Sequence, residues 1–193
     1  MKVLFAVVVP LLFLAEAHGQ TIGVFADSTG LDCNLKFPEV GITTVVYVVA
    51  TIEDEAADGA TSAIFRSEGL PDSWAVDVIA NPEVPVVIGD PFGIGVHFAF
   101  SSCHTGRVML MTIEITPHSV VENGALSVVP HSEFASGCGF EGGDCGPCER
   151  FCGCGDLFVP CYCARGITST INEATCTVAV SDRAWGNVKR LYR

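Results

Sequence analysis

Two runs of alternating apolar and polar residues, joined by a short connection that contains a glycine, constrain the fold of this chain most strongly. On the first run the apolar face carries Ile94, Val96, Phe98 and Phe100, and the other face carries Gly95, His97 and Ala99. On the second run one face carries Met109, Met111, Ile113 and Ile115. A period of two is that of a strand with one buried face. The stretch therefore predicts an antiparallel hairpin with one side in a core.

Six further segments have the composition or alternation of strands, and turn signals such as Asn123-Gly124 separate them. They are Thr21–Ala26, Thr43–Ile52, Ala60–Arg66, Trp74–Ile79, Val84–Ile88 and Ala125–Val129. Pro85 places the Val84–Ile88 segment at a sheet edge or at a bulge, because proline cannot donate to a strand ladder. About eight short strands with no helical period before residue 130 predict an all-β antiparallel sandwich, Ig-like or jelly-roll-like.

The N-terminus has the features of a secretory signal peptide. One lysine precedes an apolar run from Val3 to Leu14, and small residues follow. Cleavage is expected after Ala17 or after Gly19, so residues 1–19 are assigned to the signal. The run is shorter than the roughly 20 residues that a membrane-spanning helix needs. We expect a secreted protein, extracellular, periplasmic or on the cell surface, without a membrane span.

The charge distribution argues against nucleic acid as a partner. The formal net charge is -12, and Arg66 and Arg107 are the only basic residues between Phe37 and Glu149. Such an acidic surface repels phosphate backbones.

The chain contains ten cysteines, which in an exported protein favour disulfide bonds. They are Cys33, Cys103, Cys138, Cys145, Cys148, Cys152, Cys154, Cys161, Cys163 and Cys176. Cys33 and Cys103 stand alone near strand ends and are expected to pair with each other. The other eight can form four bridges in 105 ways, and the sequence does not choose among them.

Metal binding is the alternative function for two clusters. Cys145, Cys148, Cys152 and Cys154 have a spacing that can hold zinc through thiolates. The acidic turn with Asp54, Glu55 and Asp58 can bind calcium, although it does not match an EF-hand loop. We expect oxidised cysteines and a solvated acidic turn, and therefore no metal or cofactor.

The composition changes after the sandwich, and this divides the chain. Residues 20–135 are assigned to the sandwich, and residues 136–177 to a disulfide-rich appendage or insertion. Ala174–Val180 reads as a final strand, which favours the insertion. Residues 178–193 form a basic tail.

Motifs of catalysis are absent from the sequence. It contains no HExxH, GxSxG or Walker-type loop. His97 lies opposite the apolar face of its strand and is expected at the surface or between sheets. A scattered Ser–His–Asp triad stays open, but nothing in the sequence selects one, and no catalytic residue is assigned.

From Thr43 to Ile115 the order of features resembles the cohesin-like and related immunoglobulin-like sandwich modules of secreted bacterial proteins. The segments that carry the resemblance are VVYVVAT, GLPDSWAVDV, NPEVPVVIGDP, GVHFAF and MLMTIEI. The resemblance implies a non-catalytic binding or surface-display module with a protein or carbohydrate ligand. The Cys103 turn and the Cys-rich segment depart from the cohesin pattern, so no binding residues are carried over. The alternatives are a secreted hydrolase with an unrecognised site and a secreted zinc or calcium protein.

Overall fold

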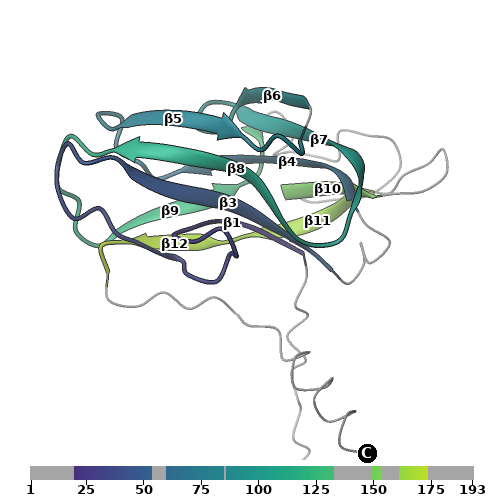
Figure 1. The fold of residues 1–193 in the computed structure, drawn as a ribbon, viewed down its shortest axis with the longest axis horizontal. Helices are drawn as coiled ribbons and strands as arrows, with labels where there is room; N and C mark the ends of the chain where they lie inside the picture. The colour runs from purple at the N-terminus through teal and green to yellow at the C-terminus, as the bar shows by residue number, and fades with distance from the viewer. Residues whose placement is uncertain (1–19, 54–59, 85, 133–148, 154–160, 174–193) are drawn as a thin grey trace, which may run out of the picture.

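The computed structural model describes residues 20–53, 60–84, 86–132, 149–153 and 161–173, and these ranges contain strands and no helix (Figure 1). The strands are β1 (Thr21–Phe25), β2 (Asn34–Leu35), β3 (Thr44–Ile52), β4 (Ala60–Glu68), β5 (Ala75–Ala80), β6 (Val86–Asp90), β7 (Gly95–His104), β8 (Gly106–Thr116), β9 (Gly124–Val129), β10 (Glu149–Gly153), β11 (Cys161–Gly166) and β12 (Thr168–Ile171). The predicted all-β class is confirmed. In this part of the chain no helix is long and apolar enough to cross a membrane.

The strands form two layers that face each other as a sandwich. The first layer has the order β1-β3-β8-β5, and the second contains β12, β9, β4, β7 and β6. Nearly all neighbours run antiparallel; the parallel pairs among the described strands are β1 with β11 and β2 with β12. The predicted antiparallel β-sandwich is therefore observed.

The predicted hairpin between the two alternating runs is wrong. β7 pairs with β4 and β6, whereas β8 pairs with β3 and β5, so the two consecutive strands lie in opposite layers. The chain crosses between the layers at Thr105 and Gly106. Alternation shows that each strand has one apolar face, but it does not show which strand lies beside it. Here both apolar faces point into the same core from opposite sides.

A β-bulge changes which residues of β8 face the core. Val48 is opposite Met111 and Val49 is opposite Met109, so Leu110 is an extra residue in the ladder. Leu110 is fully buried, whereas Met109 is half-buried on the solvent side. The prediction that Met109 shares the buried face of Met111 is therefore wrong.

Asn81 stabilises this bulge from the end of β5. Its Nδ2 donates to the carbonyl of Met109 at 2.6 Å, and its backbone nitrogen donates to the carbonyl of Leu110 at 3.2 Å. A bulge leaves backbone groups without ladder partners, and buried carbonyls need such donors.

The other strand predictions are largely confirmed. The six further segments correspond to β1, β3, β4, β5, β6 and β9, with ends shifted by up to two residues. β6 lies at an edge, as Pro85 indicated. The two-residue strand β2 was not predicted, nor were β10, β11 and β12, because their residues are polar or Cys- and Gly-rich.

The main core lies between the layers. Its largest fully buried side chains include Phe65 and Phe98, whose rings stack at a centroid distance of 5.6 Å. These rings come from the neighbouring strands β4 and β7. They meet the aliphatic side chains of β3 and β8, such as Val48 and Ile113.

A smaller cluster lies on the outer side of the first layer. It contains Phe25, Cys33 and Val49, and Tyr47 packs against it. The loop after β1 covers this cluster, and Asp27 holds the loop. The Asp27 carboxylate accepts hydrogen bonds from the backbone nitrogens of Thr29 (2.7 Å), Leu31 (3.2 Å) and Asp32 (2.6 Å), and from the Thr29 hydroxyl.

The Cys-rich part of the chain joins the two layers at one margin of the sandwich. β10 pairs with β4 of the second layer and with β11, and β11 pairs with β1 of the first layer. The described parts of this segment are thus built into the sheets. At the opposite margin the layers end in β5 and β6 (Figure 1). The signal peptide, the basic tail and the strand predicted over Ala174–Val180 lie outside the described residues.

Candidate binding surface

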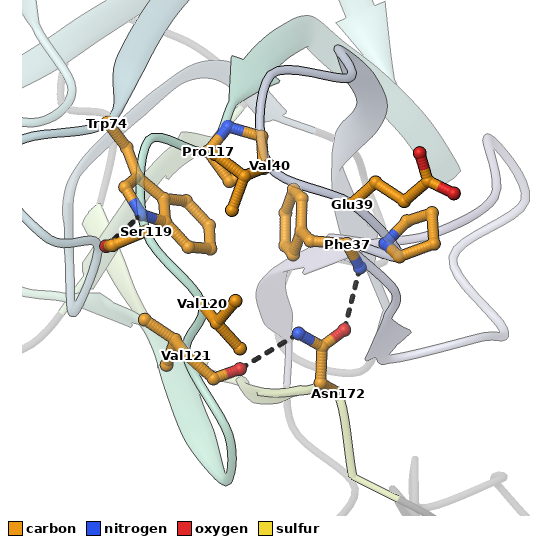
Figure 2. A pocket seen from close by; sticks show the side chains of 10 residues that line it. Phe37, Glu39, Val40, Trp74, Pro117, Ser119, Val120, Val121 and Asn172 are labelled. Carbon is orange, nitrogen blue, oxygen red and sulfur yellow. Dashed lines mark hydrogen bonds between the residues drawn. The ribbon is translucent and has the colours of Figure 1, made fainter.

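A small pocket lies at the end of the sandwich near Trp74 (Figure 2). It is lined by Phe37, Pro38, Glu39, Val40, Trp74, Pro117, Ser119, Val120, Val121 and Asn172. Its cavity volume of about 30 Å³ holds about one water molecule. Small-molecule sites are typically about 300 to 1,000 Å³. This pocket is therefore a packing feature and does not fit an organic substrate.

Two polar side chains organise the wall of the pocket. Asn172 accepts a hydrogen bond from the backbone nitrogen of Phe37 at 2.8 Å and donates from Nδ2 to the carbonyl of Val121 at 2.9 Å. It thereby ties the end of β12 to two loops. The Trp74 Nε1 donates to the Ser119 hydroxyl at 3.1 Å, and its ring packs edge-on against Phe37 at 4.9 Å. Each of these groups is engaged in holding the end of the sandwich together.

The solvent side of the first layer forms a broader surface, here called the β3–β8–β5 face. Its members are Val45, Tyr47, Asp77, Ile79, Met109, Thr112 and Glu114. The register places them in cross-strand rows, since residues directly opposite each other share a side of the sheet. One row is Asp77, Glu114 and Val45, and the next is Ile79, Thr112 and Tyr47.

This face combines exposed aliphatic side chains with carboxylates. Val45 is 40% and Ile79 is 47% exposed. Asp77 stands directly opposite Glu114, and like charges in that arrangement reduce the stability of a sheet. Neither carboxylate forms an ion pair within the described residues. Apolar side chains beside charges that do not stabilise the fold are typical of a surface that contacts another molecule.

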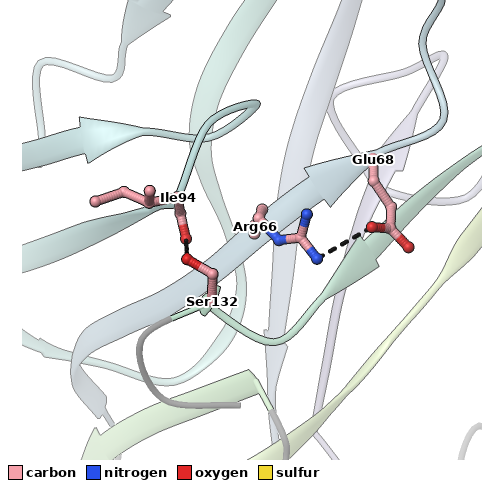
Figure 3. Close-up of polar contacts among 4 residues, drawn as sticks. All are labelled: Arg66, Glu68, Ile94 and Ser132. Atoms are coloured by element: carbon pink, nitrogen blue, oxygen red, sulfur yellow. Dashed lines mark hydrogen bonds and ion pairs between the residues drawn. The ribbon is translucent and has the colours of Figure 1, made fainter.

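Two histidines, His97 and His131, lie in contact at the second layer. The ring of His97 meets the buried ring of His131 edge-on at a centroid distance of 5.1 Å. His131 lies over Gly95, where a Cβ atom would come within 2.1 Å of its Cδ2. The Ser132 hydroxyl and backbone nitrogen both donate to the carbonyl of Ile94, at 2.7 and 2.9 Å, and hold this segment in place (Figure 3). His97 is half-buried.

Arg66 and Glu68 form an ion pair on the exposed side of β4, with a nitrogen–oxygen distance of 3.1 Å (Figure 3). Arg66 is one of only two basic residues in a long acidic stretch. Surface pairs of this kind contribute little to stability, about 0 to 1 kcal/mol. The pair neutralises the charge of Arg66, and we assign it no catalytic or binding role.

The cysteine predictions are tested only in part. Cys33 and Cys103 are each in a disulfide bond. Their pairing with each other stays a prediction. Cys152, Cys161 and Cys163 lie in β10 and β11, where the register places Cys152 opposite Cys161. Cys138, Cys145, Cys148, Cys154 and Cys176 lie outside the described residues.

Most residues of the alternative metal sites lie outside the described ranges. Asp54, Glu55 and Asp58 lie outside them, as do three of the four proposed zinc ligands. Within the part of the chain that the structure describes, no three histidine, cysteine or acidic side chains converge on a common point.

Comparison with solved structures identifies the fold. The chain is similar to the seventh ScaB type I cohesin from Pseudobacteroides cellulosolvens, with a TM-score of 0.52 and 12% sequence identity over 84% of this chain and 96% of that one. It is also similar to the cohesin module of a family 33 glycoside hydrolase from Clostridium perfringens, with a TM-score of 0.50 and 10% identity over 80% and 96%. No protein-family model matches the sequence, and no curated protein sequence is significantly similar.

These comparisons place the chain in a structural class. It is a β-sandwich with the cohesin fold, and the resemblance noted over residues 43–115 extends to most of the chain. At this level of identity the likeness concerns the fold alone, and function has to be argued from the surface.

Proposed function

We propose that this protein is an exported, non-catalytic binding module that docks a protein partner on its β3–β8–β5 face. The observation that carries the proposal is the combination of the cohesin fold with a broad face of exposed aliphatic and acidic side chains. The one pocket described above is too small for an organic substrate. A flat, partly apolar surface is the kind that protein–protein interfaces use.

The character of the exposed side chains favours a protein over a carbohydrate ligand. The large apolar residues that are exposed in the described ranges are all leucine, isoleucine or valine. Sugar rings are held against aromatic rings, which offer flat faces of the right size. Aliphatic side chains between polar groups fit the mixed composition of a protein interface.

Export and oxidation belong to the same proposal. The leader in residues 1–19 supports delivery out of the cytosol, and the disulfide-bonded Cys33 and Cys103 fit an oxidising compartment. N-terminal sequencing of the protein recovered outside the cytosol should begin after Ala17 or Gly19. A mature chain that still starts at Met1 would contradict export through a cleaved signal.

Site-specific photocrosslinking tests the docking face. A photoreactive residue is placed at Val45, and the control carries it at Glu122, which is exposed in the loop between β8 and β9. Both proteins are irradiated in the culture from which the native protein is secreted. We expect a discrete crosslinked protein from position 45 and none from position 122. Equal labelling from both positions, or none from either, would refute the proposed face.

A further inference from the structure

β5 is an open sheet edge. It pairs with β8 on one side, and none of the described strands pairs with its other side. Five of its six residues are exposed, including Val76 at 37%. Figure 1 shows β5 at the margin of the sandwich, opposite the margin that β10 and β11 join. Its outer backbone N–H and C=O groups are therefore available to another strand.

The neighbouring edge strand β6 is protected, and β5 is not. Gly89 in β6 has a φ of +101°, and a Cβ atom there would lie 2.3 Å from the carbonyl oxygen of Gly95. Prolines flank β6 on both sides in the sequence. Natural sheets use proline, lysine and irregular backbone to stop unwanted pairing at an edge. The β5 sequence AVDVIA contains none of these devices and has one charge, Asp77.

The charge around this edge selects the kind of strand that can join it. No lysine or arginine occurs between Arg66 and Arg107, while Glu68, Asp72, Asp77, Glu83 and Asp90 lie in that stretch. A second copy of this chain would bring the same acidic edge and a formal net charge of -12. A partner with lysine or arginine side chains would be attracted instead.

The register of β5 shows where the basic side chain belongs. On the solvent side, Asp77 faces Glu114 of β8, and Ile79 follows two residues later. On the inner side, Val76 and Val78 continue the apolar surface of the core strands. An added strand therefore places lysine or arginine beside Asp77 and β-branched side chains beside Val76 and Val78.

We propose that β5 is a docking edge for an extended, basic segment of a partner protein, which adds to the first layer as a further strand. This inference goes beyond the proposed function, because it concerns the edge of the sheet and specifies the conformation and charge of the partner. Backbone hydrogen bonds supply affinity in this mode of recognition, and alternate side chains supply specificity.

Three synthetic peptides test the proposal against the full secreted chain. The peptide KTVTVKVTK places its internal lysine, the sixth residue, beside Asp77 when it pairs antiparallel with β5. The peptide KTVTVEVTK replaces that lysine with glutamate, and KTVTPKVTK keeps the charge but lacks the backbone N–H opposite Val78 that the ladder with β5 needs. Binding is measured by fluorescence anisotropy, and the variants Asp77→Lys and Glu122→Lys are compared at equal net charge.

We expect saturable binding of KTVTVKVTK that is weakened about tenfold by Asp77→Lys and is unchanged by Glu122→Lys. The glutamate peptide should prefer the Asp77→Lys variant, and the proline peptide should not bind. The proposal would be overturned if the proline peptide bound as tightly as KTVTVKVTK, or if Asp77→Lys and Glu122→Lys weakened binding equally. Either result would mean that binding reflects general charge attraction. Absence of binding by any peptide would overturn it as well, while crosslinking from position 45 would still support the proposed face. A dimer of the free chain that Ile79→Lys dissociates would assign the edge to a second copy instead.

Discussion

At Gly95 the backbone and a buried histidine ring occupy the space that a side chain would need. The φ of Gly95 is +131°, and the His131 ring lies where a Cβ atom would be. Gly106 also has a positive φ, +73°, but nothing lies within 4 Å of its Cβ position. A side chain at Gly106 would therefore meet only an unfavourable φ, whereas one at Gly95 would meet an unfavourable φ and a steric clash.

We expect Gly95→Ala to lower the free energy of unfolding by about 3 kcal/mol or more, since it adds a clash to an unfavourable φ. Gly106→Ala should cost about 1 kcal/mol, from the φ alone. Urea unfolding of both variants measures the difference. Equal costs would show that His131 moves aside without penalty.

Asp27 makes the loop over the outer cluster sensitive to acid. Burial raises the pKa of this carboxyl, but the hydrogen bonds from Thr29, Asp32 and Leu31 outweigh it, so the pKa falls below its ordinary value of 3.8. A carboxyl with a depressed folded pKa contributes stability that is present above its unfolded pKa. That contribution is lost as the pH falls through the folded pKa.

The acid limb of the stability curve should therefore depend on Asp27. We expect the free energy of unfolding of the wild-type chain to decrease as the pH falls below about 4. The Asp27→Asn variant should be less stable near neutral pH, and its free energy of unfolding should decrease less over the same acid range. Urea unfolding across the pH range checks both parts. A parallel acid limb in the variant would contradict the role of this carboxylate.

At the scale of elements, the bulge in β8 decides which side chains are core. It shifts the alternation by one residue, so Val108 and Leu110 face inward while Met109 faces outward with Val49. A strand without the bulge would place Met109 in the core.

Alanine substitutions distinguish these two arrangements. Leu110→Ala should lower the free energy of unfolding by about 3 kcal/mol, because Leu110 is fully buried in the main core. Met109→Ala should cost less than about 1 kcal/mol, because its side chain is half-exposed. Chemical denaturation of the two variants is the measurement, and the reverse order of costs would mean that the bulge is absent.

At the scale of the whole molecule, the Cys-rich segment gives the sandwich its asymmetry. β10 and β11 connect the two layers at one margin, while β5 and β6 leave the other margin open. At the closed margin, β10 and β11 pair with strands that would otherwise be sheet edges. At the open margin, a partner strand can join. We propose that residues 136–177 belong to the same folding unit as the sandwich.

Oxidation of the cysteines is the prediction at this scale. The secreted chain should be about 2 Da lighter for each bridge than its reduced form, because each disulfide forms with the loss of two hydrogens. It should resist alkylation before reduction and keep its fold in a chelator. One tightly held zinc per chain, with four alkylatable thiols after its removal, would contradict this result.

Peptide mapping without reduction tests the predicted pairing of Cys33 with Cys103. A bridge between these two distant residues would contribute on the order of 4 kcal/mol to the free energy of unfolding if its geometry is unstrained. A fragment that links either residue to a cysteine of the 136–177 segment would refute the pairing.

Local pattern was sufficient for eight of the twelve strands and for the fold class. Alternation and turn residues located β1, β3, β4, β5, β6 and β9 and the two long strands β7 and β8, because a strand that buries one face must repeat every two residues. The acidic stretch around β5 was also readable from composition. These features depend on neighbours along the chain.

Pairing between strands depended on contacts that no local pattern encodes. Only the packed structure places β7 and β8 in opposite layers, shifts Leu110 into the core and uses the Cys-rich β10 and β11 to join the layers. The same is true of the β3–β8–β5 face, which brings Val45, Asp77 and Glu114 into one row from three separate segments. The physical reason is that strand order depends on the total apolar surface that all strands bury together. That total is defined only in the folded molecule.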